Sequence, residues 1–131
     1  MTSILLDTNA LLWLASPPDR IAASARDVLA DRANELFVSA VSAWELAIKT
    51  RIGSLNGAPL LSAWAEVLAT MNATDLAIGS ADATMAGRLD WERKDPFGRM
   101  IVAQAARRGL TIATSDSQLI HGALTPVLVT R

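Results

Sequence analysis

Short apolar runs alternate with segments of helical composition along almost the whole chain, and this alternation constrains the fold most. The runs that we predict to be strands lie at 4–6, 36–38, 76–78, 110–113 and 127–129. Segments typical of helices lie at 10–14, 22–32, 42–51, 60–71, 81–89 and 96–106. Apolar strands separated by helices indicate a parallel sheet that is covered on both faces. We therefore predict an α/β fold with a central parallel sheet of about five strands.

Proline and glycine mark the ends of several of these helices. Ser16-Pro17-Pro18 predicts the end of the first helix, because consecutive prolines cannot extend it. Pro96 suits the first turn of the last long helix, and Gly109 closes that helix. We find no internal repeat, low-complexity tract or linker, so we expect a single domain over residues 1–131.

The composition excludes several classes of site. The chain has 51% hydrophobic residues and no cysteine, which excludes disulfides and thiolate metal sites and fits a reducing cytoplasm. Its formal net charge of −1 argues against a globally basic surface for nucleic acid. Basic residues do gather around Asp95, where they can either hold a polyanion or simply form solvated helix faces. The first residues lack a basic segment and a long apolar run, so we expect neither a signal peptide nor a membrane span.

Four acidic residues stand where a strand ends or a helix begins: Asp7, Glu45, Asp95 and Asp116. In a parallel α/β fold such positions converge on the carboxyl edge of the sheet, where ligands bind. Carboxylates that gather there repel one another unless a hard divalent cation lies between them. The four acids therefore predict a metal-dependent active site, and the metal suggests phosphate chemistry.

Each acid also has a purely structural explanation. Asp7, Asp95 and Asp116 can each cap the helix that follows, because aspartate is a favoured N-cap residue. Ser42 and Glu45 have the spacing of a capping box. The functional interpretation depends on the coincidence of four acids at four junctions.

Other candidate sites are weaker. Lys49 lies one turn after Glu45, so it can pair with that carboxylate or contact a substrate phosphate. His121 is the only histidine, so the chain has few ligands for a zinc site and only one candidate histidine for a Ser-His-Asp triad. The chain has no glycine-rich phosphate loop.

Four blocks of sequence resemble PIN domains of the VapC toxin type, and they occur in order across nearly the whole chain. The blocks are 5–13, 42–49, 95–105 and 109–116. The resemblance implies a three-layer α/β/α sandwich. It also implies an endoribonuclease dependent on Mg²⁺ or Mn²⁺ that is the toxin of a type II toxin–antitoxin pair.

The resemblance assigns the catalytic and metal-binding roles to Asp7, Glu45, Asp95 and Asp116. The third block departs from the usual Asp-Pro-Phe-Asp-Arg pattern, because Gly98 stands where the second aspartate is expected. We therefore assign the third acid to Asp95. The implied mechanism needs no protein nucleophile, because one or two metal ions would activate a water molecule.

The resemblance also implies substrates and partners. Candidate substrate contacts are Asn9, Lys49, Arg99, Thr114 and Ser115. The expected substrate is tRNA or ribosomal RNA. The expected assembly is a homodimer within a larger complex with a VapB-type antitoxin, in which DNA is bound only through the antitoxin.

Two other interpretations remain open at this point. The first is a catalytically impaired PIN-like module that binds RNA or protein, because Gly98 removes an expected carboxylate. The second is a metal-dependent phosphatase or receiver-like protein, although the phosphoacceptor patterns expected around a strand-terminal aspartate are missing. Loss of RNA cleavage on Asp7→Asn in a folded chain would separate the nuclease from the binding module.

Overall fold

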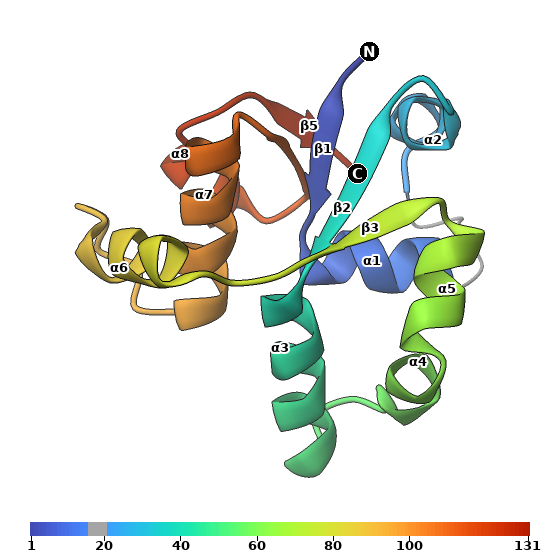
Figure 1. The fold of residues 1–131 in the computed structure, drawn as a ribbon, viewed down its shortest axis with the longest axis horizontal. Helices are drawn as coiled ribbons and strands as arrows, with labels where there is room; N and C mark the ends of the chain where they lie inside the picture. Colours follow the sequence, from blue (N-terminus) through green and yellow to red (C-terminus); the bar gives the residue numbers. More distant parts are fainter. Residues whose placement is uncertain (16–20) are drawn as a thin grey trace.

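The computed structural model, which describes residues 1–15 and 21–131, has a five-stranded sheet at its centre (Figure 1). All neighbouring strands are parallel, in the order β3-β2-β1-β4-β5. The strands are β1 (Ser3–Leu6), β2 (Glu35–Ser39), β3 (Ala73–Leu76), β4 (Thr111–Thr114) and β5 (Val127–Val129). The predicted α/β class and the predicted sheet are confirmed.

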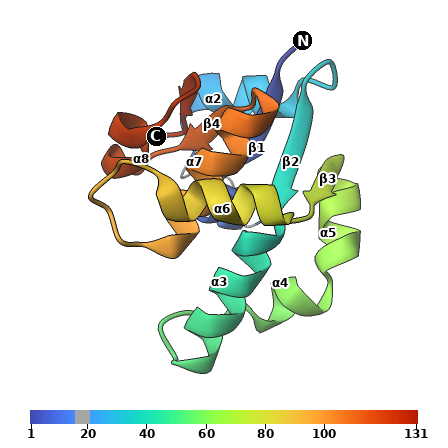
Figure 2. The same ribbon diagram turned by 60° about the vertical axis from the view of Figure 1, so that its left-hand side comes forward.

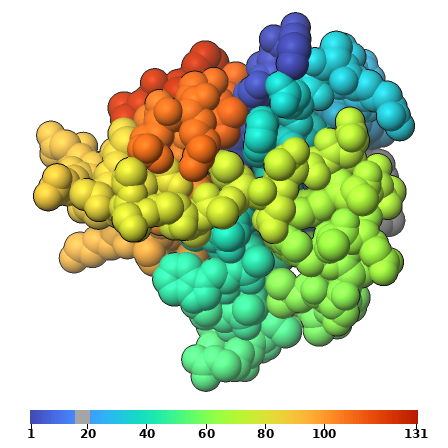
Figure 3. Space-filling view, viewed as in Figure 1, coloured from blue at the N-terminus to red at the C-terminus, as the bar shows by residue number. Residues whose placement is uncertain are grey.

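Helices cover both faces of the sheet and form the outer layers (Figures 1 and 2). One side carries α1 (Thr8–Ala15), α2 (Ala23–Ala30), α4 (Ala58–Ser62) and α5 (Trp64–Thr70). The other side carries α6 (Ser80–Arg88), α7 (Pro96–Arg108) and α8 (Ser117–Gly122). Helix α3 (Ala40–Arg51) continues from the end of β2, and Figure 3 shows it projecting from the body of the molecule.

The alternation of side chains along each strand divides the core into two clusters. Ile4 and Leu6 of β1 are fully buried against the layer of α1, α2 and α5. Leu5, between them, points to the opposite face and packs with α7 and α8. Strand β4 divides in the same way between Ile112 and Ala113. Burial on both faces explains why these strands read as continuous apolar runs.

Two elements differ most from the prediction. The segment predicted as one helix at 60–71 is two short helices, α4 and α5, which meet at Ala63. The third strand is at 73–76 rather than 76–78, and its central residues Thr74 and Asp75 are exposed. An edge strand with exposed polar residues gives no apolar run, so the sequence pattern placed it too late. The predicted helix end at 16–18 lies outside the described residues.

The strand order places a topological switch point between β1 and β4. From β1 the chain proceeds outward through β2 and β3, and it then returns to the other side of β1 to form β4 and β5. The crevice beyond the carboxyl ends of two such strands is the usual ligand site of open α/β sheets. Within the described residues, no helix has the length and apolar character needed to cross a membrane.

Candidate active site

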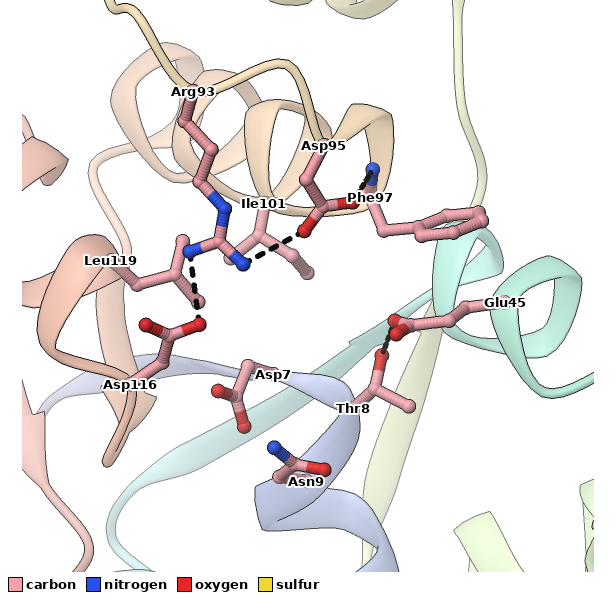
Figure 4. A pocket seen from close by; sticks show the side chains of 11 residues that line it. Asp7, Thr8, Asn9, Glu45, Arg93, Asp95, Phe97, Ile101, Asp116 and Leu119 are labelled. Atoms are coloured by element: carbon pink, nitrogen blue, oxygen red, sulfur yellow. Dashed lines mark hydrogen bonds and ion pairs between the residues drawn. The ribbon is translucent and has the colours of Figure 1, made fainter. Parts of the chain in front are cut away.

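A small pocket opens at the carboxyl edge of the sheet, at this switch point (Figure 4). Its volume of about 50 Å³ has room for a few water molecules or a small ion, but not for a nucleotide base. The lining residues come from four separate segments of the chain. They are Asp7, Thr8, Asn9, Glu45, Arg93, Asp95, Phe97, Gly98, Ile101, Asp116 and Leu119. The structure thus brings all four predicted acids to one pocket.

Asp7 lies at the bottom of this pocket, directly after β1. Its Oδ1 accepts a hydrogen bond from the Ala10 backbone N–H at 2.7 Å, so it caps α1. Its Oδ2 accepts a hydrogen bond from the Thr114 hydroxyl at 2.5 Å. The side chain is therefore fixed from both sides, and the residue is only 4% exposed.

The environment of Asp7 disfavours its charged form. Burial raises its pKa from 3.8 to about 6, although the hydrogen bonds from Thr114 and Ala10 oppose the shift. The neighbouring Asp116 and Glu45 raise the pKa further by charge repulsion. A buried carboxylate with a raised pKa, facing like charges in a crevice, is typical of a functional site.

Glu45 reaches the pocket from the second turn of α3, and the predicted capping box is wrong. Helix α3 begins at the end of β2 with Ser39 as its N-cap, so Ser42 and Glu45 lie inside the helix. Glu45 Oε1 instead accepts a hydrogen bond from the Thr8 hydroxyl at 2.6 Å. Its Oε2 pairs with Lys49 Nζ at 2.5 Å. Glu45 is thus available as a site residue.

Asp95 and Asp116 each have two roles. Both cap helices, as predicted, because Asp95 accepts a hydrogen bond from the Phe97 N–H and Asp116 from the Gln118 N–H. The other oxygen of each carboxylate accepts a hydrogen bond from Arg93 at 2.9 Å. Partial burial alone would raise the pKa of Asp116, but the bonds from Arg93 and Gln118 outweigh it and lower that pKa. The structural and the functional explanations of these acids are therefore compatible.

Arg93 is the site residue that sequence reasoning missed. In the sequence it is one of several basic residues near Asp95. In the structure its guanidinium lies between Asp95 and Asp116, which approach it from different elements (Figure 4). The nearness of Asp95 in the sequence is a weak signal for the first contact. The contact with Asp116 spans 23 residues and depends on the tertiary fold.

The predicted substrate contacts have different positions. Asn9 is exposed and lines the pocket. Thr114 is fully buried, donates to Asp7 and accepts from the Asp116 backbone N–H at 3.0 Å, so it positions these two acids. Ser115 is half-buried and is not among the residues that line the pocket.

Arg99 is not among the residues that line the pocket. Its five N–H groups donate to five backbone carbonyl oxygens, which belong to the end of α6 and to the loop before α7. The acceptors are the carbonyls of Ala86, Gly87, Leu89, Trp91 and Arg93. With every donor used in this way, Arg99 ties the end of α6 to the loop that carries Arg93.

The chemistry of the pocket suits a divalent cation, although the carboxylates are not arranged around a metal ion in this structure. No three acidic, histidine or cysteine side chains of the described residues lie close enough together to hold a metal ion as they stand. Four carboxylates line the pocket, however, and within the described residues only Arg93 and Lys49 form ion pairs with them, which leaves a formal charge of −2. Oxygen ligands with this charge fit Mg²⁺ or Mn²⁺.

The raised pKa of Asp7 predicts that this residue destabilises the metal-free protein at neutral pH. Between pH 3.8 and 6 the folded state binds more protons at Asp7 than the unfolded state, so this contribution to stability decreases as pH rises. Above pH 6 the cost is complete, at about 3 kcal/mol. Asp7→Asn, which cannot ionise, is expected to recover it.

Urea unfolding of both proteins in EDTA at pH 7.5 and pH 5 measures this effect. The stabilisation by Asp7→Asn should be about 3 kcal/mol at pH 7.5 and roughly half of that at pH 5. Equal effects at both pH values, or a loss of stability in the variant at pH 7.5, would contradict the prediction.

The chain resembles known proteins both in sequence and in fold. Residues 4–123 match the model of the PIN domain family. The chain is 30% identical to ribonuclease VapC22 of Mycobacterium tuberculosis over 119 residues, which is 91% of each chain. Its fold resembles a chain of VapBC2 from Rickettsia felis bound to a promoter DNA fragment (TM-score 0.71, 12% identity, 99% and 100% of the chains). It also resembles a chain of VapBC-1 from nontypeable Haemophilus influenzae (TM-score 0.63, 18% identity, 97% of each chain).

Proposed function

Because this chain belongs to the PIN domain family, we propose that it is a VapC-type endoribonuclease that hydrolyses RNA with a divalent metal ion. The observation that carries the proposal is the meeting of Asp7, Glu45, Asp95 and Asp116 in one pocket at the switch point of the sheet. The similarity to a relative named as a ribonuclease, over 91% of both chains, supports the same activity.

The four carboxylates would line the metal site, and the surrounding residues would fix them in place. When bound there, Mg²⁺ or Mn²⁺ lowers the pKa of a coordinated water and stabilises the charge that develops on the scissile phosphate. Thr114 orients Asp7, and Thr8 orients Glu45. Hydrogen bonds of this kind hold ligands in position and are needed for full metal affinity.

The surroundings of the pocket suit single-stranded RNA. The pocket is too small for a base, so only a phosphate can reach the carboxylates while the bases stay outside. Trp44 is 53% exposed and packs edge-on against Phe97, a lining residue, with 5.1 Å between ring centroids. Such aromatic surfaces stack unpaired bases. We therefore propose a substrate with exposed loops, in tRNA or ribosomal RNA.

We further propose that the chain is the toxin of a toxin–antitoxin pair and that its partner is a VapB-type antitoxin. The two structural relatives are VapBC proteins, and the Rickettsia structure includes promoter DNA. The formal charge of −1 gives this chain no general attraction to DNA, so DNA binding would belong to the antitoxin. A homodimer within a cytoplasmic complex with the antitoxin fits this role.

The alternative of a catalytically impaired module is not favoured. Gly98 brings no carboxylate, but Asp95 lines the same pocket as Asp7, Glu45 and Asp116. The number of acids at the pocket is therefore still four.

Incubation of the purified full chain with total tRNA and ribosomal RNA tests the function. We expect cleavage at discrete sites with Mg²⁺ or Mn²⁺, and no cleavage when EDTA removes the metal. Mapping the 5′ ends of the fragments would identify the RNA and the sequence around the cut. Intact RNA in the presence of both metals would reject the nuclease proposal.

A further inference from the structure

The guanidinium of Arg93 places a positive charge among the acids of the pocket. The guanidinium of Arg93 donates through Nη1 to Asp116 Oδ2 and through Nη2 to Asp95 Oδ2, each at 2.9 Å (Figure 4). Both acceptors line the same pocket as Asp7 and Glu45. One arginine thus pairs with both acids on its side of the pocket and offsets one of their two negative charges.

The surrounding chain holds Arg93 in this position. Its side chain is only 19% exposed, and its guanidinium lies 5.8 Å from the centre of the Trp91 ring. Its backbone carbonyl accepts a hydrogen bond from Arg99 Nη1 at 2.9 Å. The ion pairs of Arg93 therefore belong to an ordered loop, in contrast to those of a solvated surface cation, which contribute little.

Gly98 provides the space that Arg93 occupies. A Cβ atom at this position would lie 3.2 Å from Asp95 Oδ2 and 3.5 Å from both Cζ and Nε of Arg93. The backbone of Gly98 does not require glycine, because the residue lies in α7 and its φ is not positive. A methyl group here would press only on Asp95 Oδ2 and would touch Arg93 at ordinary contact distance, whereas a longer side chain would compete with Arg93 for the space beside Asp95.

The charges divide the pocket into two parts. Asp95 and Asp116 share Arg93, whereas Glu45 has Lys49 and Asp7 has only neutral hydrogen-bond donors. The two basic side chains and the four carboxylates together carry a formal charge of −2, which a single divalent ion neutralises. Mg²⁺ needs only one or two protein carboxylates, because it retains several water ligands.

We propose that Arg93 is a permanent second cation of the active site, so that the pocket takes up one divalent ion, and that Gly98 is the residue that admits this arginine. The inference rests on the proposed function, because the metal site is the one that the nuclease would use. Arg93 is then a positioning residue, which keeps Asp95 and Asp116 together without a second metal ion.

Titration calorimetry of the EDTA-stripped full chain with MnCl₂ tests this inference. The wild type should bind one ion per chain. Arg93→Gln should bind Mn²⁺ about tenfold more tightly, because a positive charge next to the site is gone. The double variant Arg93→Gln with Gly98→Asp, which frees two acids and adds a third, should bind two ions.

Lys94→Gln is the matched control, because it removes the same charge from the adjacent exposed residue, which does not line the pocket. It should bind one ion with the wild-type affinity. Thermal unfolding separates a merely structural ion pair from the proposed role. Loss of Arg93 should lower the melting temperature in EDTA, and MnCl₂ should restore more of it in Arg93→Gln than in the wild type or in Lys94→Gln.

Two ions or none in the wild type would overturn the inference, even if no Arg93 variant folds. An Arg93→Gln protein that binds Mn²⁺ no more tightly than Lys94→Gln would also overturn it. These outcomes are independent of RNA cleavage. A chain that cleaves RNA with two ions refutes only the role of Arg93, and a chain with one ion and no cleavage refutes only the nuclease.

Discussion

Asp7→Asn is expected to reduce the rate of metal-dependent RNA cleavage by about 10³-fold or more. Asp7 is the most buried acid of the pocket, and the Ala10 N–H and the Thr114 hydroxyl fix its carboxylate from both sides. Asparagine has the same shape and keeps an oxygen that can cap α1. It lacks the negative charge that a divalent cation requires.

Initial rates with a defined RNA, over a range of Mn²⁺ concentrations, measure this effect. Asp75→Asn is the matched control, because Asp75 is exposed on the edge strand β3 and does not line the pocket. It should cleave at the wild-type rate. Urea unfolding of Asp7→Asn at pH 7.5 shows that the variant is folded, so that loss of the charge is distinguished from loss of the fold. A rate within tenfold of the wild type would exclude Asp7 from the metal site.

Arg99→Ala is expected to lower the free energy of unfolding by about 3 kcal/mol. The substitution removes a donor from five backbone carbonyls at the end of α6 and in the loop before α7, of which Leu89 retains a hydrogen bond from the Trp91 N–H. Lysine cannot replace the planar group, since its single ammonium has three donors. Arg99→Lys should therefore recover only part of the loss.

Urea denaturation followed by circular dichroism measures the change. Arg88→Ala is a suitable control, because Arg88 is an exposed arginine at the end of α6. Its effect should stay within about 0.5 kcal/mol. A stable Arg99→Ala protein with weakened RNA binding would instead support the role in substrate contact that the sequence suggested.

The four acids of the pocket show which positions can be predicted from local sequence patterns. Asp7, Asp95 and Asp116 could be recognised both as helix caps and as candidate site residues, because each follows a strand or precedes a helix. Glu45 shows the limit of that reasoning. The spacing of Ser42 and Glu45 fits a capping box, but α3 begins earlier, at the end of β2, so the motif lies within the helix. The start of a helix that continues directly from a strand depends on the sheet, which a four-residue motif does not include.

The positions of the basic side chains follow less from the sequence than those of the acidic ones, for a physical reason. An arginine side chain is long, and its planar group can find partners on elements that are distant in the sequence. Arg93 and Arg99 belong to the same basic cluster, and both interact through carboxylates or carbonyls that the fold brings near. One of them lines the pocket and the other supports the loop. Nothing in the spacing of the two arginines distinguishes these roles.

The sequence by itself determined the parallel sheet with its helical layers, because burial on both faces leaves continuous apolar strands between helices. It also determined that Asp7, Asp95 and Asp116 stand at the ends of those elements. Only the tertiary structure decided that Arg93 joins Asp95 to Asp116 and that Gly98 leaves room for it. Periodicity and caps act over a few residues, whereas the charge balance of a pocket is set by side chains that meet from distant parts of the chain.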